Sequence, residues 1–133
     1  MSASPDEAHE GGCVCGGIRY RVTGTPQRVS ACACRWCQKR TGSALGISVY
    51  FDQKDVVFTQ GVLKPFGVVS DAGRWIESEF CSTCGTTVSW TLEFLPGHRG
   101  IAGGTFDEPV IDAATADIFA QSGARTGCIA EGE

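Results

Sequence analysis

The chain has 133 residues and a formal net charge of −4. This length predicts a single domain, and the acidic balance argues against nonspecific binding to nucleic acid or to an anionic membrane surface, because both partners need a basic protein face. No apolar run approaches the roughly 18 residues of a bilayer-spanning helix, and the polar N-terminus lacks the pattern of a secretory signal. We therefore predict a cytoplasmic protein that binds neither nucleic acid nor membrane.

In chain order, residues 1–11 are polar without a period and predict a disordered tail, 12–121 form the domain, and 122–133 are poor in apolar residues and are predicted to fray. Alternation of apolar and polar residues predicts half-buried strands, at 18–22, 47–51, 76–80 and 88–92. Turn-forming residues separate these runs and there are 18 glycines, so we expect an all-β domain of antiparallel sheets. Helices are predicted only at 35–41, ended by Gly42, and less securely at 113–119.

Seven of the eight cysteines fall in three tight groups, which are Cys13 and Cys15, then Cys32, Cys34 and Cys37, then Cys81 and Cys84. Disulfides do not persist in a reducing cytosol, so clustered cysteines there indicate metal ligands or redox groups. A tetrahedral zinc site needs four ligands. The count therefore favours one complete site of four thiolates and a second site of three.

The outer two groups predict the complete site. Cys81 and Cys84 enclose a two-residue turn followed by Gly85, which is a strong zinc signal, while Cys13 and Cys15 form a tighter pair that is also followed by glycine. Together they would join segments about 65 residues apart in the sequence. Such a zinc contributes on the order of 10 kcal/mol, comparable with the whole stability of a small domain. We expect the metal-free chain to be largely unfolded.

The middle group supplies three thiols within six residues and lacks a fourth ligand. His9, His98 and Cys128 are the candidates, but for each of them we favour a solvated or incidentally packed role. Water or an exogenous ligand would then complete the site, which makes Cys32, Cys34 and Cys37 the predicted catalytic group. Three thiolates on zinc make a poor Lewis acid for water and a good acceptor for a further thiol.

Several neighbouring residues are candidates for substrate contacts. Arg35, Lys39 and Arg40 could bind substrate carboxylates or form a solvated basic patch, and Trp36 could shield the metal, stack on substrate or pack. The carboxylates that could include a general base are Asp71, Glu77, Glu79, Asp107 and Glu108, although an acidic residue in a turn is usually only solvated.

The segments GGCVCGGIRYRV, CACRWCQKRTGSALGISVYF, FCSTCG and GGTFDEP resemble the glutathione-dependent formaldehyde-activating enzyme family, also called the Gfa-like or centromere protein V family. The resemblance spans about residues 12–120. It implies antiparallel sheets in a tent-like, Mss4-like arrangement around a structural zinc held by the outer four cysteines, with a catalytic zinc held by the middle three. It also implies a carbon-sulfur lyase reaction that joins glutathione and formaldehyde into S-hydroxymethylglutathione.

Two other classes of function stay open. A zinc-stabilised binding module would have saturated coordination at both metals. A thiol redox enzyme, similar to methionine sulfoxide reductases, would need a nucleophilic cysteine that is not a ligand, and Cys128 alone is available for that role. The sequence does not determine the oligomeric state.

Overall fold

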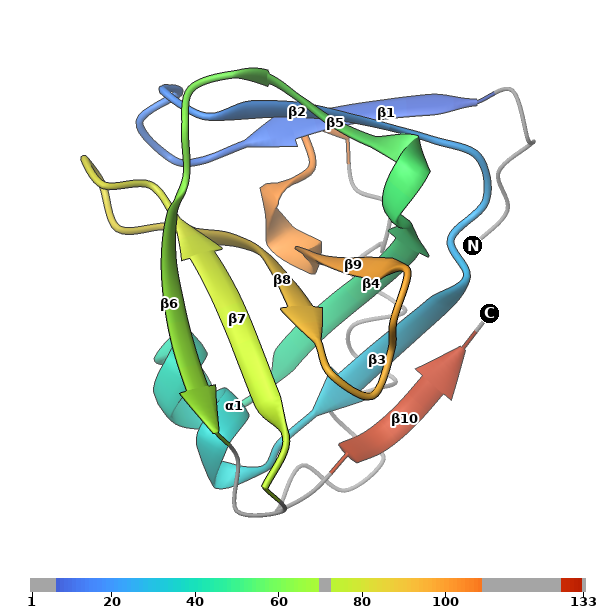
Figure 1. The fold of residues 1–133 in the computed structure, drawn as a ribbon, viewed down its shortest axis with the longest axis vertical. Helices are drawn as coiled ribbons and strands as arrows, with labels where there is room; N and C mark the ends of the chain where they lie inside the picture. The colour runs from blue at the N-terminus through green and yellow to red at the C-terminus, as the bar shows by residue number, and fades with distance from the viewer. Residues whose placement is uncertain (1–6, 70–72, 109–127, 133) are drawn as a thin grey trace.

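The computed structural model describes residues 7–69 and 73–108, and the backbone of residues 128–132. The chain forms two β-sheets in which all strand pairs are antiparallel (Figure 1). The smaller sheet has the order β1–β2–β5, with β1 at Ala8–Gly12, β2 at Arg19–Thr23 and β5 at Val56–Gln60. The larger sheet has the order β10–β3–β4–β9–β8–β7–β6, with β10 at Cys128–Gly132, β3 at Arg28–Cys32, β4 at Gly46–Asp52, β9 at His98–Ala102, β8 at Thr87–Leu92, β7 at Trp75–Phe80 and β6 at Lys64–Val69.

The predicted all-β fold with antiparallel sheets is confirmed. The four alternating runs of the sequence form β2, β4, β7 and β8. The short helix α1 spans Arg35–Thr41 as predicted, and Gly42 ends it in the left-handed conformation, with φ of 70°. Two short 3-10 helices, η1 (Gln53–Asp55) and η2 (Gly103–Thr105), complete the described elements.

The predicted tail is wrong for residues 8–11, because β1 begins at Ala8 and pairs with β2 along its whole length. The sequence does not predict this strand, because its residues do not alternate between apolar and polar. Backbone hydrogen bonds to β2 position it, and two of its residues are glycine. A Cβ on Gly11 would lie 2.3 Å from the carbonyl oxygen of Thr105, so only glycine allows the close approach of the two backbones.

The predicted frayed C-terminal segment is wrong for 128–132, where β10 pairs with β3 at the edge of the larger sheet. Residues 1–6 of the predicted tail, the predicted helix at 113–119 and the predicted domain limit at 121 lie outside the described residues.

The main core consists of buried side chains that both sheets contribute, among them Tyr20, Val22, Phe51, Val88 and Ile101. Cys13 and Cys81 belong to this same cluster, so one of the cysteine sites is built into the edge of the core. Burial of such side chains contributes about 1.5–3 kcal/mol each.

A second apolar cluster is built around Tyr50, Trp90 and Leu92. On β4, Val49 and Phe51 enter the main core, while Tyr50 between them belongs to the second cluster, as the two-residue period of a strand requires. The larger sheet therefore has apolar side chains on both faces, and the second face forms part of the wall of a cavity. In the described ranges, no helix has the length and hydropathy that a bilayer crossing would need.

Candidate metal centre

Four thiols from two segments that are distant in the sequence meet at the first site. Cys13 and Cys15 follow β1, and Cys81 and Cys84 lie between β7 and β8. All four Sγ atoms lie within 4.8 Å of one another, with 3.5 Å between Cys13 and Cys15 and 3.7 Å between Cys15 and Cys81. Four thiolates on tetrahedral zinc have Sγ atoms about 3.8 Å apart, given a Zn–S bond of about 2.3 Å. The geometry therefore fits a four-coordinate metal.

Tight turns present these thiols. Gly16 and Gly85 have φ of 79° and 81°, the left-handed region that glycine occupies without strain. The turns point backbone amides at sulfur: Ile18 donates to Cys13 Sγ at 3.2 Å and Thr83 donates to Cys81 Sγ at 3.4 Å. The hydrogen bond from the Ile18 amide contributes to a lowered pKa of Cys13, because it favours the thiolate over the thiol.

Thr86 links the two turns of the four-cysteine site. Its hydroxyl lies 3.2 Å from Cys84 Sγ and accepts a hydrogen bond from the amide of Val14 at 3.3 Å. The side chain and the amide of Thr86 lower the pKa of Cys84 to about 5. Sequence reasoning missed this residue, because a threonine after a C-x-x-C-G turn has no distinctive pattern.

The second site contains Cys32, Cys34 and Cys37, whose Sγ atoms also lie within 4.8 Å of one another. Cys32 ends β3, Cys34 caps α1 and its sulfur accepts from the amide of Cys37 at 3.4 Å. The first turn of the helix therefore brings Cys34 and Cys37 together. Burial is the main cause of the raised pKa of Cys37, and the neighbouring thiols of Cys32 and Cys34 raise this pKa further.

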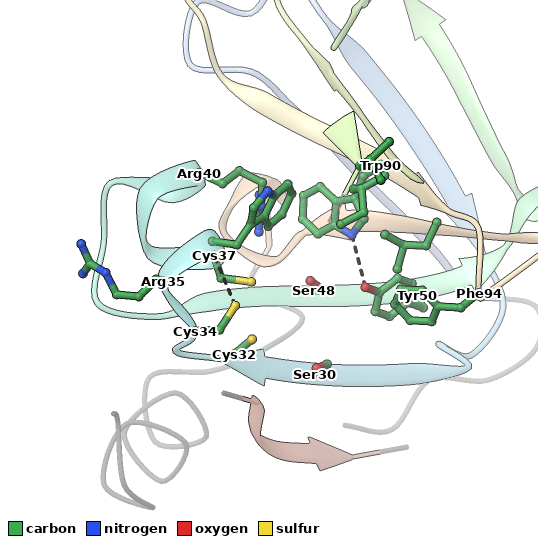
Figure 2. Close-up of a pocket in the computed structure, with 14 residues that line it drawn as sticks. Ser30, Cys32, Cys34, Arg35, Cys37, Arg40, Ser48, Tyr50, Trp90 and Phe94 are labelled. Carbon is green, nitrogen blue, oxygen red and sulfur yellow. Dashed lines mark hydrogen bonds between the residues drawn. The ribbon is translucent and has the colours of Figure 1, made fainter. Parts of the chain in front are cut away.

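The second site opens into a cavity of about 470 Å³. Figure 2 shows the three sulfurs at one end of this cavity and the side chains of Tyr50, Trp90 and Phe94 toward the other, with Ser48 between them on β4. The lining comprises three thiols, two arginines, two serines and seven apolar or aromatic side chains, which are Cys32, Cys34, Cys37, Arg35, Arg40, Ser30, Ser48, Trp36, Tyr50, Val69, Ile76, Trp90, Leu92 and Phe94.

The three basic residues next to the second cysteine group, Arg35, Lys39 and Arg40, have different surroundings in the structure. Arg40 lies 4.2 Å from the ring centroid of Trp90 and 5.6 Å from that of Trp36. Arg35 points away from the labelled aromatic side chains (Figure 2) and donates to Gln38 at 2.8 Å. Lys39 lines a neighbouring cavity of about 510 Å³, not the one that the thiols line. Of the three, Arg40 is thus the cation best placed to meet a molecule in the first cavity.

The other candidate residues take different places. Neither His9 nor His98 belongs to a metal-type cluster in the described chain; His9 pairs with Glu7, and the Nδ1 of His98 lies 3.3 Å from the carbonyl oxygen of Pro96. Asp107 forms a two-bond ion pair with Arg19, which lowers the pKa of the carboxyl, and it does not line the cavity. This ion pair joins β2 to the segment after η2, and a role of Asp107 as general base stays a prediction. The backbone of Cys128 lies opposite Cys32 in the β10–β3 ladder.

The sequence matches the family model of the glutathione-dependent formaldehyde-activating enzyme over residues 8–122, the range that contains both thiol clusters. The chain belongs to this family. No curated protein matches the sequence. This family is named for an enzyme.

Among solved structures, a protein from Rhodobacter sphaeroides shares the fold of this family member, with a TM-score of 0.62 and 18% sequence identity. The alignment covers 80% of this chain and 94% of the other. The likeness supports the two-sheet architecture, in which the thiols take their positions.

Sequence reasoning missed the residues that shape the cavity of this family member. Tyr50 accepts a hydrogen bond from Trp90 Nε1 at 3.3 Å, and both side chains are buried. The alternation on 47–51 and 88–92 places these residues in strands, but a two-residue period does not say which strands meet across a cavity.

Proposed function

We propose that this protein is a zinc enzyme that forms or cleaves the carbon-sulfur bond between a small thiol, such as glutathione, and the carbonyl carbon of an aldehyde, such as formaldehyde. In this proposal the four-cysteine site holds a structural zinc and the three-cysteine site a catalytic zinc. The observation that carries it is the difference between the sites: four thiols converge at the first, while three converge at the end of a cavity at the second.

The donor set decides the kind of chemistry. Zinc bound by three thiolates would accept a further thiol and hold it deprotonated. In the direction of synthesis, the sulfur of the thiol bonds to the carbonyl carbon, the carbonyl π electrons move to oxygen, and oxygen takes the proton that the thiol lost. No oxidant or reductant is needed. The reverse direction releases the thiol and the aldehyde.

The residues of the cavity would bind and orient the reactants. Among the described residues, neither Ser30 nor Ser48 has its hydroxyl in a hydrogen bond, and Tyr50 accepts from Trp90 and keeps its own proton to donate. These hydroxyls could donate to a carbonyl oxygen in the cavity. Holding two reactants side by side accelerates their reaction chiefly by proximity.

Cobalt substitution tests this function. We expect that addition of glutathione to the cobalt-loaded protein changes the charge-transfer spectrum of one of the two metals, because one site alone can accept a further ligand. A spectrum unchanged by thiols would contradict the proposal and favour a binding module. Disulfide or sulfenic acid formation at Cys128 during turnover would instead favour the redox class.

The variant Cys128→Ser is the control for a fourth ligand from the protein, because Cys128 lies opposite Cys32 in the ladder. We expect the cobalt spectrum and its response to glutathione to be the same in this variant. A changed spectrum before thiol is added would mean that the chain itself completes the second site, and the catalytic proposal would fail.

Acidification is expected to release zinc from the three-cysteine site first, because protons compete with metal for thiolates. A thiol with a raised pKa holds its proton more firmly at any pH below that pKa. Raised pKa values occur in both sites, because burial raises the pKa of Cys37 and neighbouring thiols raise the pKa of Cys15 to about 12, while Thr86 lowers the pKa of Cys84 to about 5. The expected order therefore follows from the number of thiols, because a site of three loses its metal more readily than a site of four. A chromogenic chelator, used from about pH 8 to pH 4, should show two release steps.

The variant Cys34→Ser assigns each step of zinc release to one site, because it removes a ligand of the second site only. This variant should show only the step at lower pH. A single step in the unmodified protein, or loss of the lower step in the variant, would contradict the order.

A further inference from the structure

The wall of the cavity that faces away from the sulfurs is almost entirely hydrocarbon. Ile76, Leu92 and Phe94 come from β7, from β8 and from the residues after β8, and Trp90 and Tyr50 adjoin them. Leu92, Trp90 and Tyr50 are each at least 92% buried even without a molecule in the cavity. No carboxylate of the described residues lines this space.

Formaldehyde does not account for this cavity. The space is about 470 Å³, which lies in the range of sites for molecules of drug-like size, whereas formaldehyde has two heavy atoms. Glutathione is large enough, but it carries two carboxylates, an ammonium group and two peptide bonds. Polar groups buried against hydrocarbon without hydrogen bonds lose their contacts with water and gain nothing in return, so this wall disfavours them.

Arg40 defines the boundary of the apolar region. Its guanidinium lies over Trp90 and Trp36, and among the described residues it forms no ion pair with a carboxylate. It lines both this cavity and the neighbouring one, which also contains Lys39. A negatively charged part of a ligand would therefore sit at Arg40 and toward Lys39, while the part beyond Trp90 is apolar.

This inference rests on the proposed function. We propose that the natural substrate is a thiol adduct whose sulfur is held at Cys32, Cys34 and Cys37. An apolar group about the size of an aromatic ring, within a few bonds of that sulfur, fills the space between Trp90, Leu92 and Phe94. The apolar group belongs either to the thiol or to the aldehyde. The bond that forms or breaks is the same carbon-sulfur bond, with the same transfer of the thiol proton to oxygen.

The test compares thiols by their effect on the cobalt charge-transfer band. We expect 2-phenylethanethiol to bind at least about tenfold more tightly than 2-mercaptoethanol, as burial of one aromatic ring implies. A second arm keeps glutathione as the thiol and compares turnover of 3-phenylpropanal with that of formaldehyde. A preference in the first arm assigns the apolar group to the thiol, and a preference in the second arm alone assigns it to the aldehyde.

Two matched variants test where the apolar group of the ligand binds. Phe94 is 48% exposed and lines the first cavity, whereas Phe66 is 60% exposed and lines the neighbouring one, so neither change removes a core side chain. In the arm that shows the aromatic preference, Phe94→Ala should lower the affinity for 2-phenylethanethiol, or the turnover of 3-phenylpropanal, about threefold or more, because part of the apolar contact is lost. The values for 2-mercaptoethanol and formaldehyde should not change. Phe66→Ala should leave the affinity of both thiols unchanged.

The outcomes separate the two proposals. If glutathione and 2-mercaptoethanol perturb the cobalt band but neither arm shows an aromatic preference, the inference is overturned and the proposed function stands. An equal effect of Phe94→Ala and Phe66→Ala in the arm that shows the aromatic preference would also overturn the inference. If no thiol perturbs the band, the proposed function itself fails.

Discussion

Removal of the metal from the four-cysteine site is expected to unfold the domain. The four thiols connect the turn after β1 with the turn between β7 and β8, and Cys13 and Cys81 are part of the main core. A structural zinc of this kind contributes on the order of 10 kcal/mol at neutral pH, while a whole domain of this size is stable by about 5–15 kcal/mol. Loss of the metal therefore removes most or all of the folding free energy.

The substitution Cys81→Ser tests this expectation. A hydroxyl in place of the buried thiolate should leave a protein without a cooperative thermal transition and with a near-ultraviolet circular dichroism spectrum close to that of a denatured chain. Cys34→Ser makes the same chemical change in the other cluster and should keep a cooperative transition. A chelator added to the unmodified protein should reproduce the effect of Cys81→Ser. A cooperative transition after complete chelation would show that the core alone stabilises the fold.

Cys34→Ser is expected to abolish the reaction while the fold is kept. Serine is a preferred N-cap residue, so it can replace the capping contact that the Cys34 sulfur makes with the amide of Cys37. It does not replace a thiolate ligand. We expect one zinc per chain, a loss of the cobalt response to thiols, and a decrease in kcat/KM of about 1000-fold or more, which corresponds to about 4 kcal/mol of transition-state stabilisation.

Metal analysis and thermal unfolding accompany the kinetic measurement. Activity that persists with one zinc per chain would place the reaction elsewhere and contradict the assignment. Asp107→Asn is a useful comparison, because Asp107 pairs with Arg19 and neither residue lines the cavity. It should change the stability modestly and leave kcat/KM unchanged, whereas a general base would lose activity.

The helices and strands that the sequence predicts correctly are those that a local pattern of residues specifies. The runs around Val49 and Trp90 alternate because one face of each strand is buried, and α1 was predicted to the residue because Gly42 stops it. The strands β1 and β10 were missed for the opposite reason. They pair at sheet edges, where backbone hydrogen bonds to β2 and β3 hold them, and such bonds leave no trace in the side-chain pattern.

The sequence by itself determined the seven thiols and their division into four and three, because ligand type and spacing are local properties that limit which sulfurs can share an ion. The structure brings together the same two groups, although ligation of zinc stays a prediction. Only the tertiary structure decided what surrounds them. Tyr50, Ile76 and Trp90 lie on three different strands, and their meeting at one cavity depends on strand order and on which face of the sheet each side chain takes. Those contacts are long-range, so no local spacing in the sequence encodes the apolar wall beside the three-cysteine site.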